Sequence, residues 1–293
     1  MDFKGLQEKA EALIEALPYM QMFRGKTVVI KYGGSAMEEE KLIERVIRDI
    51  VFLEVVGVNP VIVHGGGKAI TAKMKAAGLK AEFMDGLRVT DLQSIRIVEE
   101  VLATEINPSI TKKILEFGGN AKGYSGKEIF QAEKMYLTRA SGERIDIGYV
   151  GSVTGVNVEP LLDCIKHERV PVISPVGGGK DGATYNINAD IAAGEIAVAL
   201  KAHKIVYISD VNGIMRDPTV ADSLISTVTI SEIQTLIKDG VITAGMIPKV
   251  DSAIKALEQG VEKVHFIDGK IAHSLLLEMF TNAGIGTQII RGA

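Results

Sequence analysis

The segment Val28-Val29-Ile30-Lys31-Tyr32-Gly33-Gly34-Ser35 decides the fold of this 293-residue chain. Its β-branched apolar run predicts a buried parallel strand, and a helical pattern follows it. The segment Val61-Ile62-Val63-His64-Gly65-Gly66-Gly67-Lys68 repeats this arrangement. Glycines at a strand-to-helix turn let the backbone approach an anion and leave N–H groups free to bind it. Two such turns predict two sets of amide donors for one phosphate, with Lys31 beside them, an arrangement that suits a phosphoryl-transfer enzyme.

Strands and helical patterns alternate along the chain from residue 27 onward. Strands are expected near residues 27–32, 60–64, 171–175, 204–209, 263–267 and 287–290. Helices are expected near residues 38–56, 68–77, 92–104, 107–116, 189–202, 231–238 and 249–259. This alternation predicts an α/β fold with a mostly parallel sheet and helices on both of its faces.

Two segments depart from the alternation. Residues 119–158 are rich in glycine and alternate polar with apolar side chains, which predicts β-hairpins. Residues 177–182 form a glycine-rich stretch that predicts a turn-rich loop and a boundary between two lobes.

An amphipathic helix is expected before the first core strand. Apolar residues recur at helical spacing, and Pro18 is expected to end the helix. The apolar stripe covers either the body of this chain or another subunit. Its members are Phe3, Leu6, Ala10, Leu13 and Leu17.

Composition excludes several classes of protein. The net charge of −4 argues against non-specific nucleic-acid binding. Cys164 is the only cysteine, and the five histidines show no metal-binding spacing, so neither a disulfide nor a resident metal site is expected. No apolar run reaches the ~18 residues of a membrane span, and glutamates interrupt the N-terminal segment, unlike a signal peptide. We expect a cytoplasmic protein.

The common nucleotide-binding motifs GxxxxGK[ST] and GxGxxG are absent from the sequence. The segment Gly86-Leu87-Arg88-Val89-Thr90-Asp91 precedes a helix, which Thr90 or Asp91 is expected to cap. Arg88 is either a clamp for a carboxylate or an ordinary surface arginine.

Polar residues also stand at the start of two later helices. Asn188 is expected to cap a helix whose first turn carries Asp190, a carboxylate that can order lysine ammonium groups. Lys249 follows Pro248 at another helix start, where the helix dipole disfavours a cation unless a phosphate is near. Asp210, directly after a strand that ends at Ser209, either contacts a nucleotide or caps a turn.

Five segments together closely resemble the acetylglutamate kinases of the amino acid kinase family: residues 31–37, 64–67, 86–91, 186–190 and 245–249. Lys-x-Gly-Gly alone would indicate only the wider family, but Gly-Leu-Arg-Val-Thr-Asp with Asn-x-Asn-Ala-Asp is specific to this branch. The resemblance runs in order from about Tyr19 to Ile290. Lys68 and Ala244 depart from it, since the family usually has proline and glycine there.

The resemblance implies a three-layer αβα sandwich with an N-terminal helix and two lobes. Residues 1–18 would form the oligomerisation helix, residues 19–180 the lobe for the amino acid and for dimerisation, and residues 181–293 the lobe for ATP and arginine. It also implies ATP-dependent phosphorylation of the side-chain carboxylate of N-acetyl-L-glutamate, the second step of arginine biosynthesis. An ionised carboxylate is already a nucleophile, so no general base is required.

The resemblance also implies roles for the candidate catalytic residues. Lys31 and Lys249 would neutralise the transferring phosphate, and Asp190 would hold both lysines. The backbone amides of three glycines would bind phosphoryl and carboxylate oxygens: Gly34, Gly66 and Gly67.

Substrate and nucleotide contacts are implied in the same way. Arg88 would clamp the α-carboxylate of the substrate, and Asn186 would help to hold the acetylamino acid. Mg²⁺ would arrive on ATP, ligated by phosphates and water. The further residues implied on the nucleotide side are Gly33, Ser209 and Asp210.

The ends of the chain resemble the arginine-inhibited branch, in which N-terminal helices interlace dimers into a hexameric ring. Glu278 would meet the guanidinium or amino group of arginine. Each candidate taken alone is equally compatible with packing or capping, and the sequence leaves open whether a PII-type signal protein binds. The candidates for the arginine site are Tyr19, Lys204, His265, Glu278 and Gly284.

Two alternatives remain open from the sequence. One is a sister kinase that phosphorylates a carrier-protein-linked aminoadipate or glutamate, although Arg88 and Asn186 favour a free acetylamino acid. The other is a catalytically silent regulator that binds nucleotide and arginine, although Lys31, Asp190 and Lys249 are all present.

Overall fold

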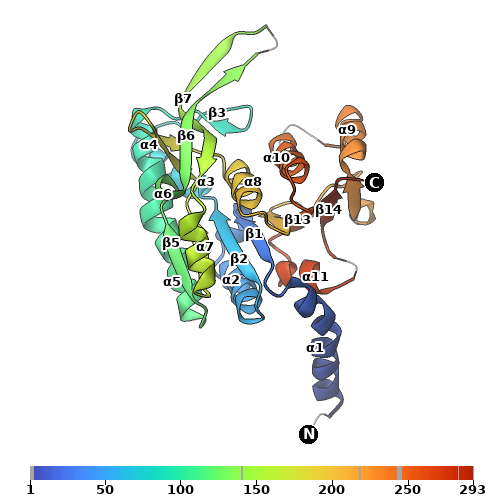
Figure 1. Ribbon diagram of the computed structural model, residues 1–293. Coiled ribbons are helices and arrows are strands. Elements are labelled where there is room, and N and C mark those ends of the chain that lie inside the picture. Colours follow the sequence, from blue (N-terminus) through green and yellow to red (C-terminus); the bar gives the residue numbers. More distant parts are fainter. Residues whose placement is uncertain (1–2, 140, 218, 243–245, 283, 293) are drawn as a thin grey trace.

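Eight strands form the central sheet in the part of the chain that the computed structural model describes, residues 3–139, 141–217, 219–242, 246–282 and 284–292 (Figure 1). Their spatial order is β12-β14-β13-β11-β1-β2-β8-β5. All neighbours pair in parallel except β13 and β14. Their bounds are β1 (Thr27–Tyr32), β2 (Asn59–His64), β5 (Ala121–Tyr124), β8 (Val170–Ile173), β11 (Lys204–Ser209), β12 (Thr227–Thr229), β13 (Lys263–Asp268) and β14 (Thr287–Ile290).

Helices cover both faces of this sheet, which confirms the three-layer αβα fold. Residues of β1 alternate between two core clusters. Val29 belongs to the cluster that includes residues of α7, α8, α9 and α10, whereas Val28 and Ile30 belong to the cluster that includes residues of α1, α2, α5 and α11. The bounds of the helices that flank the sheet are α1 (Phe3–Phe23), α2 (Glu40–Val55), α5 (Asn107–Glu116), α7 (Glu159–Lys166), α8 (Ala189–Ala199), α9 (Ile230–Lys238), α10 (Ile247–Glu258) and α11 (Ser274–Phe280).

The remaining helices are shorter or lie away from the sheet. Outside the segments discussed below, the predicted strands and helices are confirmed, with ends shifted by a few residues. The sequence did not predict β12, α7 and α11. No helix in the described ranges is long and apolar enough to cross a membrane. The bounds are η1 (Gly34–Met37), α3 (Gly67–Ala76), α4 (Leu92–Glu99), η2 (Glu100–Ile106), α6 (Gly126–Ile129) and η3 (Ala221–Ser223).

A small closed barrel and a projecting hairpin stand beside the sheet. The barrel order is β10-β7-β6-β9, and the hairpin of β6 and β7 extends beyond the body (Figure 1). The prediction of hairpins within residues 119–158 is therefore confirmed for β6 and β7 and wrong for β5, which is a parallel edge strand. The bounds are β3 (Phe83–Met84), β4 (Leu87–Arg88), β6 (Phe130–Thr138), β7 (Arg144–Val156), β9 (Val176–Gly179) and β10 (Thr184–Asn186).

The prediction of a loop over residues 177–182 is wrong for its first half, because Gly177–Gly179 belong to β9 and pair with β10. A Cβ on Gly177 would lie 2.7 Å from Cβ of Ala132 and 2.8 Å from Cδ1 of Ile187. Glycine is therefore needed here for close packing inside the barrel rather than for a turn.

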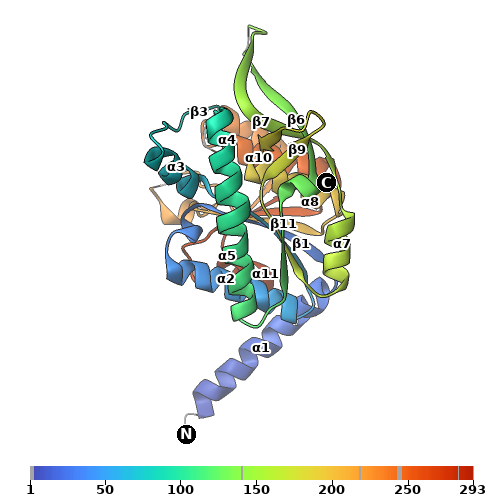
Figure 2. The ribbon, with the colours of Figure 1, turned by 90° about the vertical axis from the view of Figure 1, so that its left-hand side faces the viewer.

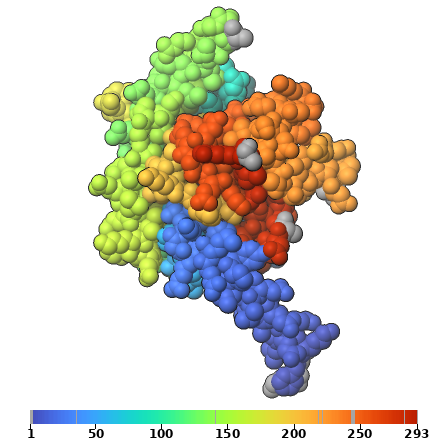
Figure 3. All heavy atoms as spheres, turned by 45° about the vertical axis from the view of Figure 1, so that its right-hand side comes forward, coloured from blue at the N-terminus to red at the C-terminus, as the bar shows by residue number. Residues whose placement is uncertain are grey.

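The prediction that Pro18 ends the first helix is also wrong, since α1 continues through Pro18 to Phe23. Proline removes the hydrogen bond to the carbonyl of Ile14, but both residues are exposed, so water can bind that carbonyl. Beyond Pro18 the helix is held by packing, with Phe23 buried against Phe280. The preceding turns project from the body (Figure 3).

The two helices predicted over residues 92–104 and 107–116 are one continuous column, visible along the face in Figure 2. Its middle section, η2, is a π-helix. Pro108 would clash with the carbonyl four residues earlier in a regular α-helix, and widening the helix removes that clash. The proline is therefore accommodated by a π-helical section and does not break the helix.

Candidate active site

The two glycine turns meet at the carboxyl ends of β1 and β2. These strands pair in parallel, with Tyr32 opposite His64, so the turns that follow them lie side by side. A Cβ on Gly65 would be 3.5 Å from Cα of Gly33. A cavity of about 210 Å³ opens against the turns and reaches Arg88 and the start of α8. This is the edge where parallel α/β sheets bind ligands.

One carboxylate lies between two lysines at this cavity. Lys31 Nζ is 3.1 Å from Oδ1 of Asp190, and Lys249 Nζ donates to Oδ2 at 3.0 Å. Burial alone would raise the pKa of Asp190, but the two lysines hold it below its ordinary value. The carboxylate therefore stays ionised and orders both ammonium groups. A Cβ on Gly33 would lie 2.9 Å from Lys31 Nζ, so this turn leaves room for the lysine.

Local capping places Asp190. Oδ1 of Asn188 accepts hydrogen bonds from the amides of Asp190 and Ile191, at 2.8 and 3.2 Å, which confirms Asn188 as the cap of α8. The backbone carbonyl of Asp190 accepts from the hydroxyl of Ser252 on α10 at 2.9 Å. Lys249 lies in the first turn of α10 as predicted, whereas Gly245 of the same motif lies outside the described residues. These contacts hold α8 and α10 together beneath the lysines.

Arg88 is buried at the other end of the cavity, with a residual exposure of 6%, so the surface-arginine alternative is wrong. Its Nη2 donates to the carbonyl of Gly67 and to Oγ1 of Thr71, each at 2.9 Å. Burial lowers the pKa of the guanidinium, which is 4.7 Å from the ring centroid of Phe83. Among the described residues no carboxylate pairs with Arg88. A desolvated cation facing a cavity favours an anionic ligand.

The remaining substrate candidates line the same cavity. Gly66 precedes α3, no side chain caps this helix, and its first amides are therefore donors for an anion. Asn186, at the end of β10, donates to Oγ1 of Thr90 at 3.4 Å. Thr90 does not cap α4, because Asp91 does so by accepting from the amide of Ser94 at 2.7 Å.

The nucleotide candidates lie on the other side of β1. β11 pairs with β1 and ends at Ser209. Gly34 has a φ of +69°, and a Cβ there would be 3.6 Å from the amide of Asp210. The fold therefore brings Gly33, Gly34, Ser209 and Asp210 to one edge of the sheet. Contact of these residues with a nucleotide remains a prediction.

The arginine-site candidates form a separate cluster. His265 Nδ1 lies 2.5 Å from Oε1 of Glu278, whose Oε2 accepts from the amides of Ile285 and Gly286 at 2.7 and 3.0 Å. Gly284 has a φ of +61°, and a Cβ there would be 2.9 Å from Oε2 of Glu278. Glu278 is thus held in place by its own chain, and glycine is required beside it.

The last turns of α1 cover this cluster. Lys204 is buried with Nζ 4.7 Å from the ring centroid of Phe23, and burial lowers its pKa to about 8. The hydroxyl of Tyr19 donates to Asn282 Oδ1. His265 Nε2 is buried without a hydrogen-bond partner among the described residues. The five candidates therefore gather where α1 meets the sheet.

Sequence reasoning missed Phe23 and Thr71. Thr71 follows Gly67 by one helical turn, a spacing that would have placed its hydroxyl beside the turn. Phe23 lies beyond Pro18, where the helix was expected to have ended. The predicted apolar stripe would continue at residues 20 and 24, so its spacing gave no signal for Phe23.

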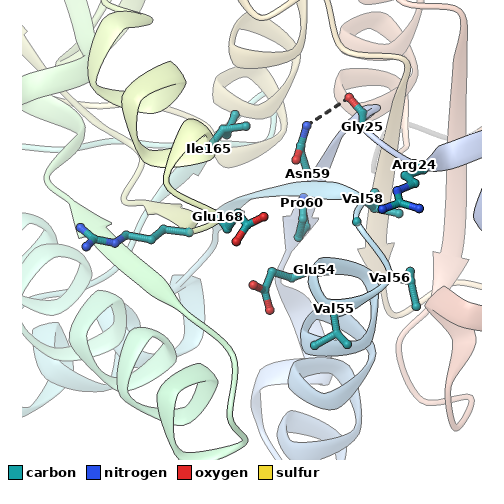
Figure 4. A pocket seen from close by; sticks show the side chains of 12 residues that line it. Arg24, Gly25, Glu54, Val55, Val56, Val58, Asn59, Pro60, Ile165 and Glu168 are labelled. Carbon is teal, nitrogen blue, oxygen red and sulfur yellow. Dashed lines mark hydrogen bonds between the residues drawn. The ribbon is translucent and has the colours of Figure 1, made fainter.

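A depression of about 500 Å³ lies at the opposite edge of the sheet, around the amino ends of β1 and β2 (Figure 4). The side chains of Glu54 and Glu168 lie near each other there. Burial raises the pKa of Glu54, and the charge of Glu168 raises it further. Lacking the glycine turns, this depression is not a candidate active site.

A metal site was not expected from the sequence. Within the described ranges, no group of three or more histidine, cysteine, aspartate or glutamate side chains is placed to hold a metal ion.

Comparison with known proteins identifies the family. Residues 26–268 match the amino acid kinase family. The acetylglutamate kinase of Akkermansia muciniphila is 50% identical over 289 residues, covering 98% of this chain and 97% of that protein. The acetylglutamate kinase of Methanocaldococcus jannaschii is 50% identical over 297 residues, covering 99% of each chain.

Solved structures agree with the fold. N-acetylglutamate synthase from Neisseria gonorrhoeae, complexed with coenzyme A and N-acetyl-glutamate, superimposes with a TM-score of 0.85 at 27% identity. This chain is covered to 97% but spans only 64% of the synthase chain. The same synthase complexed with coenzyme A and L-arginine gives a TM-score of 0.80 at 27% identity, covering 97% and 66%. The protein therefore belongs to the amino acid kinase family and, within it, to the acetylglutamate kinases.

Proposed function

We propose that this enzyme transfers the γ-phosphoryl group of ATP to the side-chain carboxylate of free N-acetyl-L-glutamate, and that L-arginine inhibits it. The observation that carries the proposal is the pairing of Lys31 and Lys249 on Asp190, at a cavity whose other end holds the buried Arg88. The sheet edge thus has a cationic place for a phosphate and a separate one for a carboxylate.

The chemistry demands positioning rather than a base. The acceptor carboxylate is ionised at neutral pH, so the barrier lies in bringing two anions together and in spreading charge on the phosphoryl group. Lys31 and Lys249 supply positive charge from two sides, and Asp190 keeps them in place. The amides of Gly34, Gly66 and Gly67 bind oxygens that become more negative in the transition state.

Arg88 and Asn186 set the orientation of the acceptor. The guanidinium of Arg88 now donates to two uncharged oxygens, of Gly67 and Thr71. A bidentate pair with the α-carboxylate would replace these by stronger, charge-assisted hydrogen bonds. Asn186, across the cavity on β10, offers an amide to the acetylamino group. Together these two residues would hold the two polar groups at the α-carbon of a free acetylamino acid.

The nucleotide would lie over Gly33, Gly34, Ser209 and Asp210. Mg²⁺ would arrive on ATP and neutralise phosphate charge. Phosphates and water would be its ligands. The division into a helix of residues 1–18, an amino-acid lobe of residues 19–180 and a nucleotide lobe of residues 181–293 belongs to the same proposal, as does a place in the cytoplasm.

Inhibition by arginine is proposed for the cluster beneath α1. Glu278 offers an acceptor to a guanidinium or ammonium group, as does Nε2 of His265, which has no partner in the part of the chain that is described. Lys204 offers a cation to a carboxylate. The related synthase of Neisseria gonorrhoeae has been solved with L-arginine. Since Tyr19 and Phe23 of α1 line the cluster, a ligand there would act on this helix.

The exposed part of α1 favours an assembly of dimers into a hexamer. It projects from the body and carries apolar side chains in water, which a second subunit would cover (Figure 3). These side chains are Phe3, Leu6, Leu13, Ile14 and Leu17.

The test is steady-state ADP release with ATP, Mg²⁺ and N-acetyl-L-glutamate, with and without millimolar L-arginine. Activity that arginine suppresses supports the whole proposal. Activity that arginine does not change would support the proposed reaction and contradict the proposed regulatory site. ATP binding without ADP release would favour the carrier-linked sister kinase or the silent regulator.

A further inference from the structure

His64 has no part in the mechanism above, yet it lies directly before the second glycine turn. It is fully buried at the end of β2. Its Nδ1 lies 2.9 Å from the carbonyl oxygen of Gly65, and its Nε2 lies 3.3 Å from Nδ2 of Asn107. Both ring nitrogens therefore have a partner.

The surroundings decide which nitrogen carries the proton. Burial lowers the pKa of His64 to about 4, so the ring is neutral at physiological pH. Nδ2 of Asn107 also donates to the carbonyl of Val172 at 2.8 Å and lies 3.4 Å from that of Tyr124, and these two carbonyls fix it as the amide nitrogen. The carbonyl oxygen of Gly65 can only accept a hydrogen bond, so the proton of the neutral ring is on Nδ1, and Nε2 is left as an acceptor facing the amide nitrogen of Asn107. Nδ1 then donates to the carbonyl of Gly65.

This hydrogen bond orients a peptide of the phosphate-binding turn. A trans peptide directs its C=O and N–H to opposite sides. With the carbonyl of Gly65 held by the buried ring, the N–H of Gly66 is directed away from the ring, and Gly66 lines the active-site cavity. The amide of Gly65 donates to the carbonyl of Tyr32 at 2.7 Å, so the turn is tied on both sides.

The π-helix supports the same turn from behind. A Cβ on Gly66 would lie 2.6 Å from Cδ2 of Leu102 and 2.7 Å from Cδ1 of Ile106, both in η2. Asn107 follows η2 directly. The π-helical section therefore presents two side chains to the glycine turn, which has no room to move back, and Asn107 at the start of α5 presents its amide to His64.

We propose that His64 is a positioning residue, which with Asn107 locks the Gly65–Gly66 peptide so that the amides of Gly66 and Gly67 face the reacting oxygens. The inference rests on the proposed function, because those amides act in phosphoryl transfer. It predicts that His64 contributes to turnover rather than to substrate affinity.

Three substitutions at position 64 test this inference. In His64→Asn, an amide nitrogen takes the place of Nδ1 and still reaches the carbonyl of Gly65. In His64→Gln, an amide nitrogen takes the place of Nε2 and that hydrogen bond is lost. His64→Leu removes both polar contacts. Since misplacement of a catalytic group by about 1 Å can cost roughly 10²-fold, kcat should fall about 10- to 100-fold in His64→Gln and His64→Leu. His64→Asn should stay within about fivefold of wild type, with the KM for N-acetylglutamate little changed in all three.

The measurements are kcat and KM from ADP release, with thermal midpoints for each variant. Equal loss of kcat in His64→Asn and His64→Gln, or loss that follows the thermal midpoint, would overturn the positioning role. The ¹⁵N spectrum of histidine-labelled wild type gives a readout that needs no variant: a neutral His64 protonated on Nδ1 supports the inference, and protonation on Nε2 contradicts it. Wild type that releases no ADP would instead count against the proposed function, which the spectrum does not test.

Discussion

Lys249 Nζ lies 3.0 Å from Oδ2 of Asp190, although these residues begin two different helices and are far apart in sequence. The other oxygen of this carboxylate is 3.1 Å from Lys31 at the end of β1. One buried carboxylate therefore keeps two ammonium groups within reach of one phosphate. A site of this kind acts through charge placed in advance, which costs no reorganisation during the reaction.

Lys249→Ala should reduce kcat by about 10²- to 10³-fold, because it removes charge stabilisation made mostly in the transition state. The thermal midpoint should change little, since Asp190 keeps Lys31 as a partner. Lys255→Ala on the same helix is the control, as its ion pair with Glu195 is exposed. A Lys249→Ala enzyme with unchanged kcat would remove this lysine from the mechanism.

Asp49 should make the stability depend on pH. This buried carboxylate on α2 contacts Nδ1 of His273 at 2.6 Å. Burial raises its pKa from 3.8 to about 6, against the lowering effect of His273 and of the Leu275 and Leu276 amides. The folded protein thus binds more protons than the unfolded chain between about pH 4 and pH 6. The free energy of unfolding falls as pH rises through this window, by on the order of 2–3 kcal/mol.

Asp49→Asn should abolish that contribution while keeping an acceptor for the amides of α11. Urea unfolding at pH 4.5 and pH 7.5 should show the variant gaining stability relative to wild type at the higher pH. Asp239 is exposed, so Asp239→Asn is the control, and its stability should match that of wild type at both pH values. If the free energies of unfolding of Asp49→Asn and wild type differ by the same amount at both pH values, Asp49 does not titrate in this range.

Deletion of residues 1–17 should convert a hexamer into dimers and weaken inhibition by arginine, while catalysis persists. The deleted turns project from the body and leave the active-site cavity untouched. Ile14→Glu should act in the same direction, because Ile14 is exposed and apolar. Size-exclusion chromatography with light scattering measures the assembly. A truncated chain that still elutes as a hexamer would refute the interlacing role of α1.

His265→Ala should raise the arginine concentration for half-inhibition by about tenfold or more, since one lost hydrogen bond to a charged group is worth about 1.5–3 kcal/mol. Turnover without arginine should stay close to wild type, because His265 lies outside the cavity at the glycine turns. The exposed His167→Ala, at the residue that follows α7, is the matched control. Inhibition that His265→Ala leaves unchanged would discard this cluster as the arginine site.

Much of the fold followed from local pattern. The β-branched runs, the glycine turns and the helical spacing predicted the mostly parallel sheet. The cap at Asn188 and the helix start before Lys249 were also predicted correctly, since both depend on neighbours in sequence. The failures occurred where packing overrode local preference. α1 continues through Pro18 to a buried Phe23, and Gly177–Gly179 form a strand because barrel packing needs small residues.

The sequence by itself determined the strand-to-helix turns, the family resemblance and the residue types at the site, since these depend on residues close together in the chain. Only the tertiary structure decided that Arg88 is buried and that Asn107 reaches His64, and only it gave the distances at which Asp190 joins Lys31 to Lys249, a contact that the resemblance had implied. Such contacts join segments far apart in sequence. Strand order and helix packing set their distances and burial, and neither leaves a periodic signal in the chain.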